Sequence, residues 1–372
     1  MRARAERPLS RLRFTDGSLG WLVTGYAEAR QVLADPRFSA RLDLAGSAIR
    51  RNAPDAGPPG AFLFMDPPDH TRCRKPLTGR FTVRRMRLLE PRIAETVEAT
   101  LTAMERGGPP ADLVTQFALP VASQVICALL GVPYAGHEAF ERQSLDMVDP
   151  TKDEAERAAA GEAMFQMLHA LVRHKRAEPA DDLLSGLTGS DLDDVELTGI
   201  AMVLLFAGHE TSANMLALGT FALLRHPDQL AALRAGESDV DDVDGAVEEL
   251  LRHLSIVQYE VNRAALADVE VAGETISAGE SVLVSLPLAN RDGDRFPDPD
   301  ELDLTRATGG HLAFGHGVHQ CLGQQLARIE LRLGCTTLLR RFPDLRLAIP
   351  AEEVPLRTGR GIYGVDRLPV AW

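Results

Sequence analysis

The sequence predicts a mainly helical protein with a minor β component, an α+β fold. Residues 70–263 are typical of helices, which prolines and glycines interrupt at intervals. After residue 263, short segments alternate apolar with polar residues around glycines, as strands do. No repeat or low-complexity linker divides the chain, so we expect residues 1–372 to form a single domain.

A short strand and a helix are expected before the helical region. Residues 21–24 (WLVT) predict the strand, and residues 27–34 predict a helix that ends before Pro36. Residues 46–60 are rich in glycine, proline, alanine and asparagine, which predicts a long loop. Breaks inside the helical region are expected at Pro91, 107–110, Pro133, Pro150 and Pro179.

One helix has clear limits in the sequence. Asp193 and Glu196, three residues apart, form the pattern of a capping box at its start. Pro227 stops it just after His226, which gives a helix of roughly 30 residues. A helix of that length must cross the whole molecule.

The C-terminal part returns to short elements. Residues 268–276 and 281–286 alternate around Gly273 and Gly279 and predict hairpin strands. A helix is expected over residues 322–339, before the RRFP sequence that ends it, and the final residues again predict short strands.

The composition excludes several classes of protein. The chain has 40 Lys and Arg against 53 Asp and Glu, and a net charge of −13 disfavours binding to nucleic acid or anionic lipid. Its four cysteines are too few for a disulfide-stapled secreted scaffold and lack the spacing of a zinc module. They are Cys73, Cys127, Cys321 and Cys335.

No targeting or membrane segment is expected. The basic N-terminus has no apolar run after it, which argues against a secretion signal. Two long apolar segments, 113–136 and 197–224, contain prolines or the ionisable pair His209 and Glu210, which would be costly in lipid. We therefore expect buried helices, no membrane span and a cytoplasmic protein.

The densest chemical signal is FGHGVHQCLG, residues 314–323. Its glycines allow tight turns and a close approach of the backbone to a flat group. Cys321 stands where a helix begins, and the free N–H groups of a helix start favour a thiolate. One thiolate on such a loop is a good ligand for iron and leaves the opposite axial side open. On its own, a cysteine in such a position is more often a buried structural residue than an iron ligand, so the surrounding motifs must decide between these two roles.

This stretch resembles the FGxGxHxCxG signature of the haem-thiolate monooxygenases, the cytochromes P450, and matches every fixed position. Four further motifs resemble the family's and occur in its order: DPPDHTR (66–72), AGHETS (207–212), ELLR (249–252) and NRD (290–292). The similarity runs from about residue 21 to the C-terminus and is nearest the soluble bacterial members. It implies the cytochrome P450 fold, with haem between a long central helix and the cysteine-bearing helix.

The resemblance also implies how haem b would be held. Cys321 would bind the iron and donate electron density that favours O–O cleavage. The two propionates need cationic partners. The matching positions are His70, Arg74, Arg263 and His319, each of which would otherwise be an ordinary surface charge. Further contacts with the haem are implied for Ala207, Gly208, Phe314, Gly315 and Gly323.

Glu249 and Arg252 lie three residues apart and so share a helix face. Without the family they would be a surface ion pair. The resemblance implies a buried structural pair that fixes the loop before the cysteine, with Arg306 as a third member.

The motif at 207–212 implies oxygen activation. Gly208 would leave a groove for dioxygen, and Glu210 beside Thr211 would relay protons as water leaves. Without the family, Thr211 would bond back to its own helical turn. His209 is interpreted as a packed or solvated histidine and not as a ligand.

The resemblance implies oxidation of a lipophilic small molecule. Hydroxylation or epoxidation of a polyketide, a macrolide or a steroid-like compound is expected, with oxidative coupling or C–C cleavage as the alternative. A non-catalytic haem sensor is a third interpretation, which the intact Glu210–Thr211 pair disfavours. The expected pocket residues are Met65, Val203, Ala207, Val257 and Ile362.

The family also implies electron donors, namely a ferredoxin and a ferredoxin reductase that draw on NAD(P)H. Residues 70–87 contain seven Lys and Arg and no acid, which suggests a docking patch for an acidic donor. Arg72 and Arg80 are expected to contribute to this patch. We expect a monomer.

Overall fold

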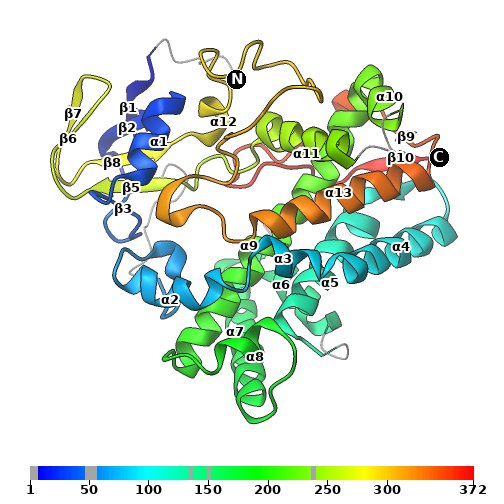
Figure 1. Cartoon of the computed structure of the whole chain (residues 1–372), viewed down its shortest axis with the longest axis horizontal. Helices are drawn as coiled ribbons and strands as arrows, with labels where there is room; N and C mark the ends of the chain where they lie inside the picture. Colours follow the sequence, from blue (N-terminus) through cyan, green and yellow to red (C-terminus); the bar gives the residue numbers. More distant parts are fainter. Residues whose placement is uncertain (1–6, 47–56, 134–136, 149–151, 236–239) are drawn as a thin grey trace.

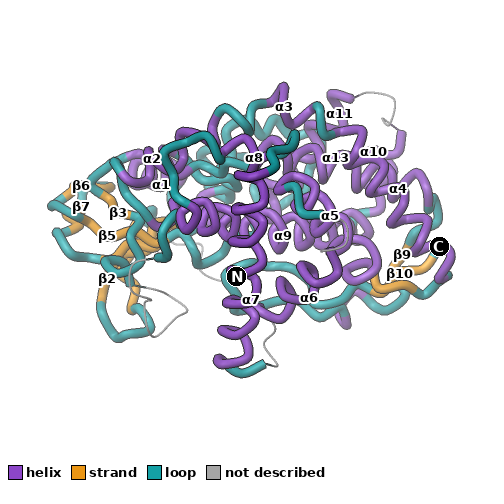
Figure 2. Tube along the Cα trace, turned by 90° about the horizontal axis from the view of Figure 1, so that it is seen from below, coloured by secondary structure: helices purple, strands orange, loops and turns teal. Residues whose placement is uncertain are grey.

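The computed structural model describes residues 7–46, 57–133, 137–148, 152–235 and 240–372. Helices fill the centre of the molecule, and the strands gather at two opposite ends (Figures 1 and 2). The expected break at Pro150 and most of the loop expected over 46–60 lie outside the described residues.

The helices follow the sequence expectation closely. They are α1 (Tyr26–Ala34), α2 (Asp69–Thr78), α3 (Val83–Arg87), α4 (Glu90–Gly107), α5 (Leu119–Leu130), α6 (His137–Val148), α7 (Glu154–Ala177), α8 (Leu183–Leu187), α9 (Asp194–Arg225), α10 (Pro227–Ala235), α11 (Val240–Leu254), α12 (Leu286–Ala289) and α13 (Gln324–Arg341). Short 3-10 turns lie at η1 (Phe62–Phe64), η4 (Gly317–His319) and η5 (Ala351–Glu353), and a π-helical turn, η2 (Val114–Ala118), leads into α5.

Helix α9 is the central helix. It has 32 residues, and Asp193 caps it in a complete capping box with Glu196, as expected. Helices α5, α7 and α13 pack against it. By length and composition α9 could cross a membrane, but 61% of its apolar window is buried inside the protein. Helix α9 is therefore the core helix around which the others pack.

Within the described residues the strands form three small sheets. They are β1 (Leu9–Arg13), β2 (Leu19–Val23), β3 (Phe38–Ser39), β4 (Ala111–Asp112), β5 (Asn262–Ala265), β6 (Val269–Val271), β7 (Glu274–Ile276), β8 (Ser281–Val284), β9 (Arg346–Leu347) and β10 (Pro369–Ala371). The largest sheet has the order β1-β2-β8-β5-β3, and a second has the order β4-β10-β9.

The strands after residue 263 pair differently from the expectation. β6 and β7 form the expected hairpin around Gly273. β8, which was expected to join a hairpin, instead pairs in parallel with β2 and antiparallel with β5. The hairpin prediction is thus wrong for β8, because one partner, β2, is about 260 residues away and the other, β5, precedes the β6–β7 hairpin.

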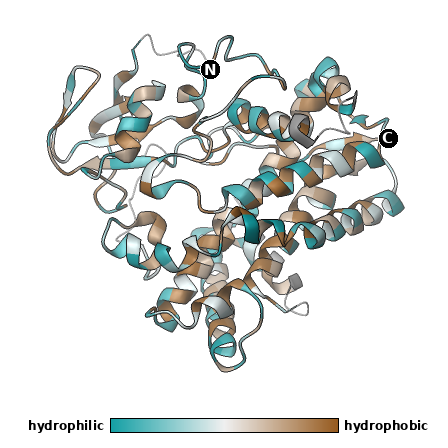
Figure 3. Cartoon of the chain, in the orientation of Figure 1, coloured by the Kyte–Doolittle hydropathy of each residue, from teal (hydrophilic) through white to brown (hydrophobic). Residues whose placement is uncertain are grey.

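Apolar residues gather where the helices meet, and polar residues cover the outside (Figure 3). One large core joins the helices, and a smaller core lies between α1 and the five-stranded sheet. The loop before α13 runs between these two cores, which places residues 310–323 at the centre of the molecule (Figure 1).

Candidate active site

The loop that carries Cys321 is folded back on itself. The Cys321 N–H donates to the Phe314 carbonyl (2.8 Å), so the two ends of the motif are joined. Gly317 has a φ of 75°, and a Cβ there would collide with the Leu33 carbonyl of α1. Only glycine fits at this point, and the loop is consequently pressed against α1.

Cys321 lies before α13 and not at its first turn, since the N-cap of α13 is Gly323. Burial raises the pKa of the Cys321 thiol, and the backbone N–H groups of Gly323 and Gln324 and the nearby Arg74 lower it only in part. The helix start thus acts in the expected direction, but burial outweighs it. A cation bound at the sulfur would reverse this balance, because a metal binds the thiolate.

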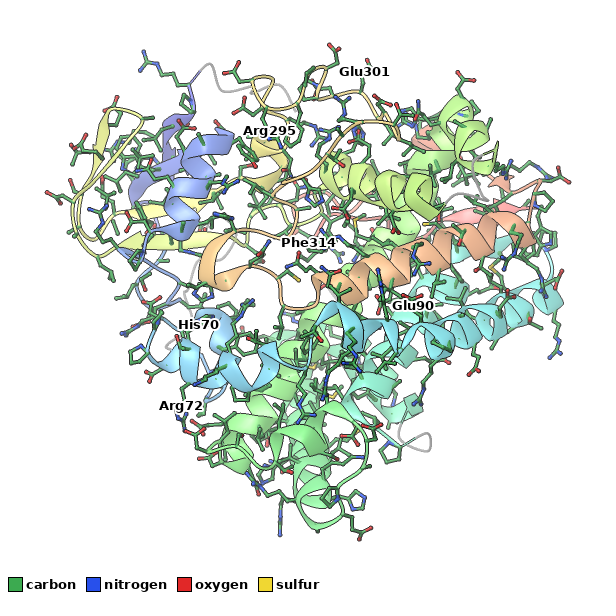
Figure 4. The ribbon with its side chains drawn as sticks, viewed as in Figure 1. His70, Arg72, Glu90, Arg295, Glu301 and Phe314 are labelled. Atoms are coloured by element: carbon green, nitrogen blue, oxygen red, sulfur yellow. The ribbon has the colours of Figure 1, made fainter. Side chains whose placement is uncertain are left out.

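Four side chains that carry or can accept a proton converge beside this loop. His70 and His319 stack with ring centroids 4.3 Å apart, and Arg74 donates to the Gln320 carbonyl. His70 and Arg263 are buried, with 3% and 8% exposure. In Figure 4, His70 lies on α2 below the loop that carries Phe314. These residues come from α2, from β5 and from the cysteine loop.

The four side chains of this group have too few acceptors and too little negative charge around them to satisfy their buried nitrogens. Both ring nitrogens of His70 and Nδ1 of His319 are buried without a hydrogen-bond partner among the described residues. Burial lowers the pKa of His319 to about 3, aided by Arg263, His70 and Arg74, and burial lowers the pKa of Arg263 to about 10.

Asp66 is the acid that acts on His70 and Arg263, but it also accepts hydrogen bonds from Ser39 Oγ and the Ala40 N–H. A bound dianion would supply the missing acceptors, and the two propionates of a haem fit this requirement.

Arg72 and Arg80 differ from their expected role at the surface. Arg72 forms ion pairs with Glu196 (2.6 Å) and Asp191 (3.3 Å), and Arg80 donates to the Gly186 carbonyl (2.8 Å). Both side chains therefore tie α2 and the segment after it to the α8–α9 region (Figure 4 labels Arg72). Besides the ion-paired Arg72, the exposed basic side chains of this segment are Lys75, Arg84, Arg85 and Arg87.

On α9, the acid and the alcohol have separate partners. Thr211 Oγ1 donates to the Ala207 carbonyl (2.5 Å), and Glu210 Oε1 accepts from Arg357 Nη1 (3.3 Å). Burial raises the pKa of Glu210, while Arg357 and Arg360 oppose the rise. No sequence pattern pointed to Arg357, which lies 147 residues from Glu210.

A Cβ on Gly208 would lie 3.1 Å from Ile126 Cδ1, so the glycine allows α5 to approach α9. Ala207 and Thr211, four residues apart, share another face, and Ala207 is exposed. His209 is buried, with burial lowering its pKa to about 4, which fits a packed histidine.

The pair Glu249 and Arg252 is fully buried. Arg252 Nε and Nη2 bind the two Glu249 carboxylate oxygens at 2.7 and 2.8 Å, and Arg306 Nε lies 3.3 Å from the same carboxylate. Arg252 also donates to the Asn290 carbonyl, while Asn290 Oδ1 accepts from the Leu312 N–H (2.6 Å). The cluster thereby connects α11 with the start of the cysteine loop.

The expected pocket residues lie on segments around α9. Val257 pairs with Ile362 in an isolated bridge, and Met65 ends η1, which contacts α9. Met65, Val203, Val257 and Ile362 are partly buried against the main core. The structure thus joins Val257 and Ile362 directly, and Val203 and Ala207 lie on α9 itself.

The fold and the site define a class: a cysteine on a glycine-turned loop, beside two arginines and two buried or partly buried histidines, is typical of a protein that holds haem through sulfur. Comparisons give the family. The family model for cytochrome P450 matches residues 135–356. Cytochrome P450 105C1 of Streptomyces sp. is 52% identical over 371 residues, which cover 99% of this chain and 93% of that protein. The chain belongs to the cytochrome P450 family, whose members are haem-iron monooxygenases fed by redox partners.

Solved structures agree with this fold. A mutant of CYP105P1 matches with a TM-score of 0.94 and 44% identity, covering 100% of this chain and 94% of that one. The LnmA cytochrome P450 hydroxylase from the leinamycin biosynthetic pathway of Streptomyces atroolivaceus matches with a TM-score of 0.90 and 42% identity, covering 100% and 95%.

Proposed function

We propose that the protein hydroxylates, or epoxidises, a lipophilic small molecule in a biosynthetic pathway, such as a polyketide, a macrolide or a steroid-like compound. One observation supports the haem site most directly: His70, Arg74, Arg263 and His319 converge beside Cys321, and the two histidines have buried nitrogens with no partner among the described residues. The likeness to the LnmA hydroxylase supports a role in making a natural product.

In this proposal Cys321 binds the iron of haem b, and the four convergent side chains bind its propionates. When bound, the haem would activate O2 so that one oxygen atom enters the substrate and the other leaves as water. The Glu249–Arg252–Arg306 cluster keeps the cysteine loop in place, since it is attached to the loop through Asn290.

Protons would reach the site through Glu210 and Thr211. The raised pKa of Glu210 lets its carboxyl hold a proton closer to neutral pH than an exposed glutamate can. Because Thr211 donates its hydrogen to the Ala207 carbonyl, its oxygen remains free to accept a hydrogen bond. Thr211 can therefore orient a proton donor beside the reacting oxygen.

The substrate would contact mainly apolar side chains. Met65, Val203, Ala207, Val257 and Ile362 carry no charge, which suits a lipophilic molecule held mainly by burial. The Val257–Ile362 bridge gives this wall a rigid backbone support.

Electrons would come from NAD(P)H through a ferredoxin reductase and a ferredoxin. The exposed Lys75, Arg84, Arg85 and Arg87 offer an acidic donor a positive surface within a chain of net charge −13. We place the protein in the cytoplasm as a monomer that binds neither nucleic acid nor membrane.

The absorption spectrum of the reduced protein with carbon monoxide tests the iron ligand. The wild type is expected to show the strongly red-shifted band of a thiolate-bound haem, and Cys321→Ala is expected to lose it. Cys335→Ala, at a buried cysteine on α13, serves as the matched control and should keep the band. A haem-loaded wild type without the shift, or a shifted band in Cys321→Ala, would refute the assignment.

Difference spectra across a library of lipophilic compounds would then identify a ligand for turnover. Mass analysis of its product is expected to show one added oxygen atom. A product that gains none would favour oxidative coupling instead.

A further inference from the structure

Helix α11 carries two adjacent carboxylates that serve different clusters. Glu249 faces inward to Arg252 and Arg306. Glu248 instead binds His311, which begins the cysteine loop, and Arg328, which lies on α13. Glu248, His311 and Arg328 are called the Glu248 cluster below. None of its members belongs to the motifs that the sequence indicated.

The Glu248 carboxylate is fully used by its two partners. Its Oε2 lies 3.0 Å from both His311 Nε2 and Arg328 Nη2, and its Oε1 accepts from Arg328 Nε. Arg328 therefore binds it with two parallel hydrogen bonds, the strong geometry for an arginine–carboxylate pair. Burial acts to raise the pKa of Glu248, but the bonds from His311 and Arg328 outweigh it and the pKa falls to about 2.

The hydrogen bonds of His311 fix its tautomer. The Ala313 N–H donates to His311 Nδ1 (3.1 Å), so that nitrogen is an acceptor and carries no hydrogen. His311 Nε2 must then hold the proton and donate it to Glu248. Through this chain of bonds, Glu248 holds the loop backbone directly before Phe314.

Arg328 lies over the Phe314 ring. Its guanidinium carbon is 4.6 Å from the ring centroid, and the His311 ring is 5.9 Å from the same ring. Arg328 Nη1 is held further by Gln324 Oε1 (3.1 Å). The Phe314 carbonyl accepts a hydrogen bond from the Cys321 N–H. The charge of Arg328 therefore lies against Phe314, the residue that is hydrogen-bonded to Cys321.

We propose that Arg328, which Glu248 holds in place, is a positioning residue for the iron site. It fixes the Phe314 ring and directs a positive charge toward the sulfur of Cys321. A positive charge there stabilises an added electron, so Arg328 favours the reduced iron. The inference rests on the proposed function, in which Cys321 binds the iron.

The midpoint potential of the purified, haem-loaded protein tests the proposal. Arg328→Gln is expected to shift the ferric-to-ferrous ratio at a fixed potential about tenfold toward ferric, which is 59 mV for one electron. Arg328→Lys keeps the charge and should restore at least half of that shift. Arg328→Met, whose apolar stem can still cover Phe314, removes the charge with less loss of packing and should behave as Arg328→Gln does. A potential unchanged in both uncharged variants, or no restoration by lysine, would overturn the proposal.

The chain offers a matched control one helical turn further along. Arg332 on α13 pairs with Asp244 on α11 (3.4 Å) and with Glu90 on α4 (3.0 Å), beside which Figure 4 shows α13. Arg332→Gln and Asp244→Asn change the same kinds of charge on the same two helices, farther from Cys321. Both variants should leave the ferric-to-ferrous ratio within twofold of the wild type. A tenfold shift in either would mean that any charge change on these helices alters the potential, which would contradict the proposal.

A double-mutant cycle tests the role of Glu248. In a Glu248→Gln background Arg328 is no longer held, so the further change Arg328→Gln should shift the ratio less than threefold. An undiminished tenfold shift would show that Glu248 does not position the arginine. The carbon monoxide spectrum separates the two hypotheses: an absent red-shifted band in the wild type rejects Cys321, whereas a normal band with an unchanged potential in the Arg328 variants rejects only this inference.

Discussion

Neighbouring residues of the α9 motif have different surroundings. Glu210 is held by Arg357 from the C-terminal segment, with side chains 29% and 17% exposed. Thr211 makes its bond within its own helix. The acid and the alcohol are therefore fixed independently, and removal of one leaves the contacts of the other in place.

This independence allows a clean test of Thr211. Thr211→Ala should divert electrons to hydrogen peroxide and lower product formed per NAD(P)H by about tenfold or more, because the hydroxyl that orients the proton donor is lost. Binding of a compound found by difference spectra should change less than twofold. Thr211→Ser, which retains the hydroxyl, is the control and should stay close to wild type. Equal coupling in Thr211→Ala and the wild type would count against the relay.

The sequence located residues whose motif is local and missed those whose partners are distant. The buried pair of Glu249 and Arg252 was found because its spacing repeats a familiar pattern. Arg357 has no local signal, since its contact with Glu210 spans 147 residues. Adjacent helical residues point about 100° apart, so the sequence does not determine which of Ala207 and Gly208 faces α5.

At the scale of elements, the contact between α9 and α13 encloses an acid. Glu330 of α13 is 3% exposed, and its Oε2 has no hydrogen-bond partner within the described part of the chain. Burial raises its pKa to about 8, and a hydrogen bond with Ser212 of α9 opposes the rise only in part. The interface between the two helices that would enclose the haem therefore contains a protonated carboxyl at neutral pH.

This pKa predicts a pH dependence of stability. The folded pKa of Glu330 lies above the unfolded value, so its stabilising contribution is complete below about pH 4.5 and is lost as the pH rises to about 8. Glu330→Gln removes this titration. The difference in free energy of unfolding between Glu330→Gln and the wild type should therefore shift in favour of the variant by about 2–3 kcal/mol from about pH 5 to pH 7. Urea unfolding at both pH values measures the difference.

The control for this prediction is Glu95→Gln, at an exposed position of α4. It should follow the wild type at both pH values. If the free energy of unfolding changed equally with pH in Glu330→Gln and the wild type, Glu330 would be ionised in the folded protein, and the prediction would be wrong.

The limits of α9 could be predicted because Asp193, Glu196 and Pro227 act within a few residues of the helix ends. The five-stranded sheet could not, because its pairings depend on segments that are far apart in the chain. β2 and β8 lie side by side although about 260 residues separate them. β8 has four consecutive buried residues, a pattern that does not identify its neighbours.

Over the whole molecule, charge is distributed unevenly. The net charge is −13, yet α3 and the end of α2 expose Lys75, Arg84, Arg85 and Arg87. Leu88, which directly follows α3, is 74% exposed, so this surface combines apolar and basic groups. Helix α3 contacts α13, the helix that follows Cys321, so the surface lies on the cysteine side.

Charge reversal on α3 tests this surface as the site of electron entry. The double variant Arg84→Glu and Arg85→Glu should slow reduction by an acidic ferredoxin about tenfold at low salt and flatten the salt dependence. Stopped-flow reduction over a range of ionic strengths measures both. Arg142→Glu with Arg173→Glu, at exposed positions of α6 and α7, is the control. Equal rates for the α3 variant and the wild type at every ionic strength would exclude this surface.

That the 372 residues form one domain stays a prediction. The two hydrophobic cores are distinct, but the cysteine loop lies between them and is attached to both. Its Gly317 is pressed against α1 beside the smaller core, and Phe314 packs against the larger one.

The parallel pairing of β2 with β8 also governs when the protein can be completed during translation. At about 5–20 residues per second, the ribosome needs roughly 13–50 s to make the residues between the two strands. The N-terminal hairpin of β1 and β2 must wait that long for its partner. His70 and Arg74 are made early, whereas Arg263, His319 and Cys321 emerge near the end. A nascent chain therefore lacks a complete set of the residues proposed to hold haem until synthesis is almost finished, and a chain terminated before residue 321 lacks Cys321 altogether.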